Sequence, residues 1–141
     1  MPETANRKDL FEHWSGSYNQ AVNRECFPLI GYRQVLRTII AQADFQPHHR
    51  ALDLGVGTGN LAKRIPLPQN QIWGVDFAVN MLQKAATDLP DANLIQVDLL
   101  DPCWPPEIEQ PFDRIISAYT LHEFPDEIKQ NMLLHLAKKS L

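Results

Sequence analysis

The sequence contains little cysteine and no long apolar run. Its two cysteines, Cys26 and Cys103, lie far apart and belong to no metal-ligand motif, so we expect reduced thiols, a cytoplasmic location and no metal site. No stretch approaches the roughly 18 consecutive apolar residues that suggest a membrane-spanning helix. The first nine residues also lack the apolar segment of a signal peptide, so we expect no membrane contact.

The sequence also lacks an excess of basic residues. Lysine and arginine together number 13 against 17 aspartates and glutamates, and the formal net charge is −4. Phosphate contacts require clustered Lys and Arg, and no such cluster is present, which argues against nucleic acid as a partner. With 141 residues, 44% of them apolar and 21% charged, the chain has the composition of one soluble globular domain.

Short apolar runs alternate with helical patterns from Arg50 onward. The runs predict strands over 51–54, 71–75, 93–97 and 112–117, and the intervening patterns predict helices over 60–65, over 79–87 and from Asp126. The proline-rich connection before the fourth strand is predicted as a loop. This alternation implies an α/β fold with a doubly wound, mostly parallel sheet, whose ligands bind at the carboxyl ends of the strands.

Two helices are predicted ahead of the sheet. The first carries apolar side chains between Leu10 and Ala21, and the second begins near Tyr32 and ends near Gln46. We therefore divide the chain into an N-terminal helical cap or lid over residues 1–46 and a core over residues 47–141. In the last helix, we expect one apolar stripe, formed by Ile128, Met132, Leu133, Leu136 and Ala137.

The first strand runs directly into a loop with three glycines, Asp53-Leu54-Gly55-Val56-Gly57-Thr58-Gly59. The third glycine follows the second by two positions rather than three, unlike the dinucleotide-binding fingerprint, and no lysine follows as in a phosphate-binding P-loop. Glycine lets the backbone turn tightly and approach a ligand closely. The acidic Asp53 favours a positively charged ligand group over a phosphate, and an ordinary strand-to-helix turn is the alternative.

The segment from Leu52 to Ala62 resembles motif I of class I S-adenosylmethionine-dependent methyltransferases, in the form found in uncharacterised bacterial members. The segment from Phe112 to His122 resembles motif IV of the same family. The resemblance implies a Rossmann-like fold, S-adenosyl-L-methionine as cofactor and methyl transfer to an acceptor. The cofactor contacts that it implies in these two motifs are Asp53, Gly55, Val56, Gly57, Thr58, Gly59 and, through backbone at the methionine end, Ala118.

The second and third strands end in carboxylates at positions that the family uses. Asp76 is expected to bind the ribose hydroxyls, and a helix N-cap is its alternative or additional role. Phe77 and Met81 are expected to cover the adenine, with plain core packing as the alternative. Asp98 is expected to accept a hydrogen bond from the adenine amino group, and the Leu99 N–H to bond a ring nitrogen, the alternative being a loop without a ligand.

Two further residues are candidates for contact with the reacting groups. The segment Phe11–Asn19 resembles the opening of many small-molecule methyltransferases, although Asn19 stands where Asp is usual. There Tyr18 is expected to fold over the cofactor, unless its helix only packs on the sheet edge. His122 is the candidate general base, with Glu123 second, and a loop histidine bonded to backbone is the alternative.

The family's sheet has seven strands in the order 3-2-1-4-5-7-6, and we expect the last three to be absent from this chain. Strand four would then be an apolar edge. Either the chain is a fragment of a longer gene, or another chain, a second copy or a partner, covers this edge. The functional alternatives to a methyltransferase with a small-molecule acceptor are a cofactor-binding fragment or regulatory module with weak or no catalysis and, less favoured, an NAD(P)-dependent oxidoreductase.

Overall fold

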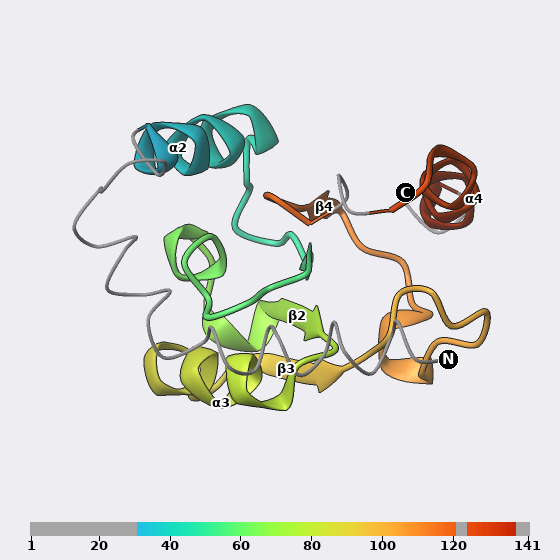
Figure 1. Ribbon diagram of the computed structural model, residues 1–141. Helices are drawn as coiled ribbons and strands as arrows, with labels where there is room; N and C mark the ends of the chain where they lie inside the picture. Colours follow the sequence, from blue (N-terminus) through green and yellow to red (C-terminus); the bar gives the residue numbers. More distant parts are fainter. Residues whose placement is uncertain (1–30, 121–123, 138–141) are drawn as a thin grey trace.

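The computed structural model describes residues 31–120 and 124–137, whose arrangement Figure 1 shows. Four strands form one sheet: β1 (Ala51–Leu54), β2 (Ile72–Asp76), β3 (Asn93–Gln96) and β4 (Arg114–Ile116). Their order is β3-β2-β1-β4, and each neighbouring pair is parallel. This topology confirms the predicted parallel α/β sheet, with β1 in its interior and β4 at one edge.

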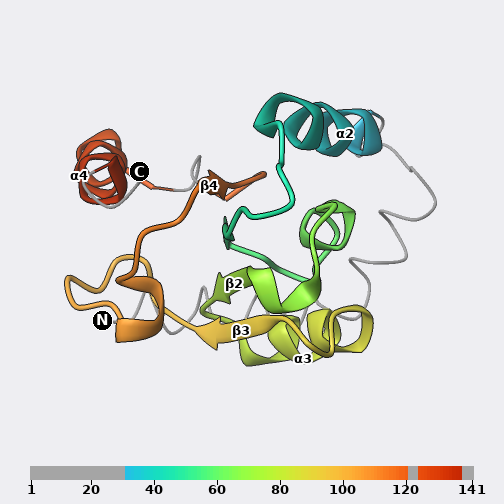
Figure 2. The ribbon, with the colours of Figure 1, turned by 180° about the vertical axis from the view of Figure 1, so that it is seen from behind.

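Helices cover the sheet on both sides. Within the described residues these are α2 (Tyr32–Ala43), α3 (Val79–Asp88) and α4 (Asp126–Ala137), with the 3₁₀ turns η1 (Ala62–Arg64), η2 (Gln69–Gln71) and η3 (Pro106–Ile108). In Figures 1 and 2, α2 and α4 lie on either side of β4, and α3 runs beside β2 and β3. Helix α2 ends before the predicted boundary near Gln46 because Asp44 is left-handed, with φ of 50°.

The hydrophobic core consists of two clusters, one on each face of the sheet. The α2 cluster includes Tyr32, Leu36, Ala51, Val56, Ile72, Leu89 and Ile116. The α4 cluster includes Leu52, Leu54, Val75, Phe112, Met132 and Leu136. Successive residues of β1 alternate between the two clusters, so Asp53 lies on the same face as Ala51, the face that α2 covers.

Three further predictions differ from the observed structure. The helix predicted over 60–65 is the single turn η1, because Ile65 is already extended ahead of Pro66. The fourth strand is confined to the three residues that pair with β1. The apolar stripe of α4 is wrong at two positions, since Leu133 is 54% exposed and Ala137 is also exposed.

The exposed side of α4 borders an open groove beside β4. The groove has a volume of about 430 Å³ and is lined by Leu54, Ile115, Ile116, Ser117, Leu133, Leu136 and Ala137. Among the described strands, β4 has β1 as its sole neighbour. Leu133 and Ala137 are therefore exposed because they face this groove rather than a packed sheet.

Candidate functional site

The glycine loop that follows β1 is fixed against β2. The Val56 N–H donates to the Val75 carbonyl oxygen at 2.8 Å, and the Val56 side chain is buried beside Gly74. A Cβ atom at Gly74 would lie 2.8 Å from Val56 Cγ2, so this approach depends on the missing side chain. The loop is therefore held at the carboxyl end of the sheet, where ligands of doubly wound folds bind.

Asp53 is a buried carboxylate with unmet hydrogen-bonding capacity. It is 1% exposed, and neither of its carboxylate oxygens has a hydrogen-bond partner among the residues that the structure describes. Burial raises the pKa of Asp53 well above its ordinary value, and the nearby Asp76 carboxylate raises it further. Because an unpartnered buried acceptor costs about 1–3 kcal/mol, the site favours a ligand with a positive or hydrogen-bond-donating group.

Asp76 accepts hydrogen bonds from backbone at two places. Its Oδ2 accepts from the Gly57 N–H at 2.9 Å, and its Oδ1 accepts from the Ala78 N–H at 3.0 Å, directly before α3. Burial raises the pKa of Asp76, while hydrogen bonds from the N–H groups of Ala78, Gly57 and Phe77 oppose the rise. Asp76 thus links the glycine loop to the start of α3, and a carboxylate's roughly four acceptor positions leave room for a ligand hydroxyl.

The chain that follows β4 encloses the site from the other side of β1. Ser117 Oγ donates to the Leu54 carbonyl oxygen at 2.8 Å. Thr120 Oγ1 lies 3.4 Å from the carbonyl oxygen of Gly55 and 3.2 Å from that of the partly buried Ala118. A Cβ atom at Gly55, where φ is 74°, would lie 2.2 Å from Thr120 Oγ1, so position 55 requires glycine. These contacts fix the ends of β1 and β4 relative to each other.

Gly57 marks the open part of the loop. Its φ is 55°, and within the described chain no atom of a distant residue lies within 4 Å of where its Cβ would be. A ligand can therefore approach the backbone here without meeting a side chain. Open backbone at Gly57, the Asp53 carboxylate, which has no partner among the described residues, and the acceptor Asp76 together fit a compact ligand with a positive group and hydroxyls.

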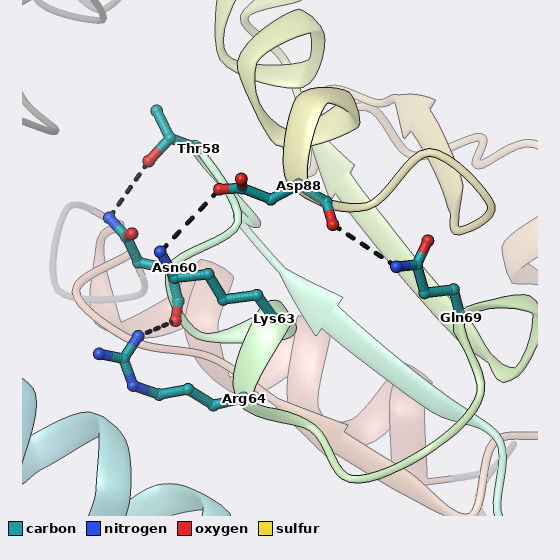
Figure 3. Close-up of polar contacts among 6 residues, drawn as sticks. All are labelled: Thr58, Asn60, Lys63, Arg64, Gln69 and Asp88. Atoms are coloured by element: carbon teal, nitrogen blue, oxygen red, sulfur yellow. Dashed lines mark hydrogen bonds and ion pairs between the residues drawn. The ribbon is translucent and has the colours of Figure 1, made fainter.

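Polar contacts hold the far end of the glycine loop, as Figure 3 shows. Thr58 is buried, and its Oγ1 accepts a hydrogen bond from Asn60 Nδ2 at 3.2 Å. Lys63 Nζ lies 3.9 Å from Oδ2 of Asp88, the last residue of α3. Gly59 also packs against α3, beside Ala85. The side chains of Thr58 and Val56 are both buried.

The remaining predicted contacts lie around the ends of β2 and β3. Met81 is buried on α3, and Phe77 is partly exposed. Asp98 is exposed, and its Oδ1 accepts a hydrogen bond from the Leu100 N–H at 3.0 Å. Leu99 packs in part against the α4 cluster. Their expected contacts with adenine remain predictions.

The structure adds three residues to which the sequence assigned no role, Ser117, Tyr119 and Thr120. Hydroxyl side chains directly after a strand could have indicated the backbone contacts of Ser117 and Thr120. No sequence signal indicates the left-handed backbone of Tyr119, because aromatic residues rarely adopt it. Tyr18 and His122 lie outside the described residues, so their roles also remain predictions.

The described residues 31–120 and 124–137 hold no group of three or more His, Cys, Asp or Glu side chains that could bind a metal ion. Cys103 is an exposed free thiol. None of the helices in this part of the chain is both long enough and apolar enough to cross a bilayer.

Sequence comparison identifies relatives of this chain. Residues 51–139 match the family described as Methyltransferase domain. An uncharacterized methyltransferase of Geobacillus kaustophilus is 35% identical over 132 residues, covering 89% of this chain and 57% of the relative. Another, of Geobacillus thermodenitrificans, is 33% identical over 144 residues, covering 93% of this chain and 63% of the relative. The chain thus spans about three fifths of the length of these relatives.

Solved structures share the fold. A DhpI-SAM-HEP complex superimposes with a TM-score of 0.75 at 16% identity, covering 98% of this chain and 61% of that one. The magnesium protoporphyrin IX methyltransferase of Synechocystis PCC 6803 with bound SAM gives a TM-score of 0.67 at 16% identity, covering 94% of this chain and 71% of that one. These similarities show a Rossmann-like fold. The matched residues include the whole sheet and the three-glycine loop that follows β1. Because the match extends over most of the chain, this chain belongs to the methyltransferase domain family.

Proposed function

We propose that this chain binds S-adenosyl-L-methionine at the carboxyl ends of β1, β2 and β3 and serves methyl transfer to a small-molecule acceptor. Asp53 carries the proposal, because it is a buried carboxylate without a partner in the described structure, directly before the open glycine loop. The cofactor has an ammonium group, a sulfonium and a ribose diol, which complement carboxylate oxygens. Proteins of the same fold that carry SAM or SAH in solved structures support this choice of ligand.

Each part of the site has a role in this proposal. Asp53, Ala118 and the backbone of Gly55–Gly59 hold the methionine end. Asp76 accepts hydrogen bonds from the ribose hydroxyls. The adenine is surrounded by Phe77, Met81, Asp98 and Leu99.

The bound cofactor supplies a methyl carbon that its sulfonium already activates. The residues of this chain contribute alignment and exclude water. The contacts of Ser117 with Leu54 and of Thr120 with Gly55 keep the end of β4 in a fixed position relative to the end of β1. An acceptor that binds beside β4 is thereby held at a constant position relative to a ligand at β1. His122, or Glu123, would take a proton that the acceptor releases.

Calorimetry with S-adenosylhomocysteine, the demethylated cofactor, tests the proposal. We expect the parent chain to bind it and Asp76→Ala to bind it about tenfold more weakly or worse, because hydrogen bonds to a charged group are lost. Gly57→Val should have a similar effect, since a β-branched residue is strained at φ of 55° and fills the open backbone. Circular dichroism of each variant establishes that it is folded.

Gly31→Ala is the matched control. Gly31 also has positive φ, 84°, and no atom of the described chain beyond its neighbours lies within 4 Å of its Cβ position, but it lies at the start of α2. If folded Asp76→Ala and Gly57→Val proteins bind S-adenosylhomocysteine as tightly as the parent, the proposal is wrong. Preferential binding of NADH would instead favour an oxidoreductase, and cofactor binding without a methylated product from any acceptor would favour a non-catalytic binding module.

A further inference from the structure

We propose that Tyr119 is the aromatic wall against which the methyl acceptor binds, and that the acceptor carries a flat aromatic ring. This inference rests on the function proposed above and specifies its substrate class. Tyr119 lies in the chain that leaves β4, between Ala118 and Thr120.

The backbone of Tyr119 is strained. Its φ is 60°, a left-handed conformation that bulky residues rarely adopt and that costs conformational free energy. Among the described residues, Asp44 is the other non-glycine residue with positive φ, and it follows the end of α2, where such a conformation is common. Tyr119 lies at no end of a helix in the described structure, so its conformation requires another explanation.

Contacts on both sides of the Tyr119 backbone and ring maintain this strained conformation. The next residue, Thr120, is packed on Gly55. The Tyr119 ring stacks on Tyr32, with the ring centroids 5.2 Å apart and the ring planes at 26°. Tyr32 is buried at the first position of α2, which runs beside β4, so it supports the Tyr119 ring from the core side.

Tyr119 nevertheless remains exposed. Half of its surface is accessible, although one side of its ring is covered by Tyr32. If Tyr119 served only core packing, burial of its side chain would have to offset the free-energy cost of its strained backbone. Full burial would offset that cost best. A strained, supported and half-exposed ring is instead suited to contact with a ligand.

The strand order places Tyr119 on the acceptor side of the site. In the proposed binding mode, the adenine and the ribose lie at the ends of β3 and β2, and the methionine end lies at β1. Since the order is β3-β2-β1-β4, the chain after β4 forms the next wall beyond the sulfur and the methionine end. In the described part of that wall, Tyr119 presents an exposed large hydrophobic side chain.

The stacked pair favours a flat ring as the next layer. Aromatic rings associate in offset-stacked or edge-to-face pairs with centroids about 4.5–7 Å apart, and the Tyr32–Tyr119 pair falls in this range. A cation could also bind the face of a tyrosine ring. A quaternary ammonium centre on this ring, however, would be repelled by the nearby sulfonium and has no free electron pair to attack the methyl carbon.

Saturation-transfer NMR on the full chain with excess S-adenosylhomocysteine tests the inference. The probes are indole as the aromatic molecule, cyclohexanol as a non-planar molecule and tetramethylammonium as a cation. We expect transfer to indole above that to the other two, and a signal weaker by about threefold or more in Tyr119→Leu and Tyr119→Gly, because an aromatic pair is lost. Tyr119→Phe should retain the signal.

The strain itself separates a ligand role from a structural one. Glycine adopts the left-handed conformation freely, so Tyr119→Gly should melt no lower than Tyr119→Leu although it removes the ring entirely. Leu134→Ala, on the exposed side of α4, is the matched control and should leave the indole signal unchanged, since Leu134 is 62% exposed and does not line the groove beside β4.

Several results would overturn the inference: no indole signal in the parent, equal indole signals in the parent and Tyr119→Gly, or transfer to cyclohexanol or tetramethylammonium that matches indole. Calorimetry of S-adenosylhomocysteine binding is carried out on the same samples. A parent chain that does not bind S-adenosylhomocysteine would contradict the proposed function itself. Binding of S-adenosylhomocysteine without the Tyr119-dependent indole signal would contradict only the inference about the acceptor.

Discussion

The Asp53 carboxylate lies in unfavourable surroundings, because it is buried and neither of its oxygens has a hydrogen-bond partner in the described structure. Its raised pKa means that, above the ordinary value of about 4, the folded chain holds a proton that the unfolded chain has released. The stability contributed by Asp53 therefore falls as pH rises through the raised pKa. We expect Asp53→Asn to be more stable than the parent at pH 7, by about 1–3 kcal/mol, with a smaller difference at pH 4, in urea unfolding curves.

Asp113→Ala is the control for this prediction. The Asp113 Oδ2 accepts a hydrogen bond from the Arg50 N–H at 2.8 Å, directly before β4, so this carboxylate has a structural partner. Removing it should lower the stability at pH 7. Asp53→Asn should at the same time weaken S-adenosylhomocysteine binding. An Asp53→Asn protein that is less stable than the parent at pH 7 would contradict the destabilising role of the buried carboxylate, and one that binds S-adenosylhomocysteine as tightly as the parent would contradict its contact with the ligand.

Among the elements, the contact between β2 and the glycine loop depends on Gly74. Alanine in a strand is ordinarily favoured over glycine by roughly 0.5–1 kcal/mol. Here the added Cβ would lie 2.8 Å from Val56 Cγ2 and 3.0 Å from Leu94 Cδ2. We therefore expect Gly74→Ala to destabilise the chain by about 1–3 kcal/mol in urea unfolding, as overpacking does.

A double-mutant cycle identifies the cause of this destabilisation. Val56→Ala removes the methyl groups that the new Cβ would meet and should itself be destabilising, because Val56 is buried. Combined with Gly74→Ala, it should cost less than the sum of the two single changes, by about 0.5 kcal/mol or more. Strict additivity would show that the loop is not packed on β2 through this contact.

At the scale of the whole molecule, the groove between β4 and α4 has no further strand beside it in the described structure. The chain spans 57% of the Geobacillus kaustophilus relative. We propose that additional strands of a longer polypeptide pack along β4 and cover Leu133 and its neighbours, since an open apolar strand edge pairs readily with other chains. The present chain would then keep the cofactor contacts and have weak catalysis or none.

A chimera tests this proposal. It joins to the present chain the part of the Geobacillus kaustophilus relative that has no counterpart in this chain. We expect a melting temperature higher by at least several degrees and less self-association, measured by calorimetry and by sedimentation velocity at equal concentrations. S-adenosylhomocysteine affinity should change little, because Asp53 and Asp76 belong to β1 and β2. Unchanged melting and self-association would show that the edge of β4 needs no such cover.

Within the described residues, local sequence patterns predicted the order of the four strands and of α2, α3 and α4, and the position of the glycine loop. Local apolar periodicity reflects backbone geometry, and it placed β1 without error and β2, β3 and α3 to within one residue at each end. The glycine spacing after Asp53 depends on residues adjacent in the chain, so it indicated the motif directly. Prediction was weaker for the turn η1 and the face of α4, where neighbours distant in sequence determine the outcome.

The enclosure of the candidate site depends on contacts between segments that are far apart in the sequence. Thr120 and Gly55 are 65 positions apart, and their contact arises because β1 and β4 are neighbours in the sheet. The stacking of Tyr119 on Tyr32 and the isolation of the Asp53 carboxylate likewise follow from packing between distant segments. Hydrogen-bond satisfaction, burial and backbone strain depend on which atoms surround a group in space, and neither composition nor local periodicity contains that information.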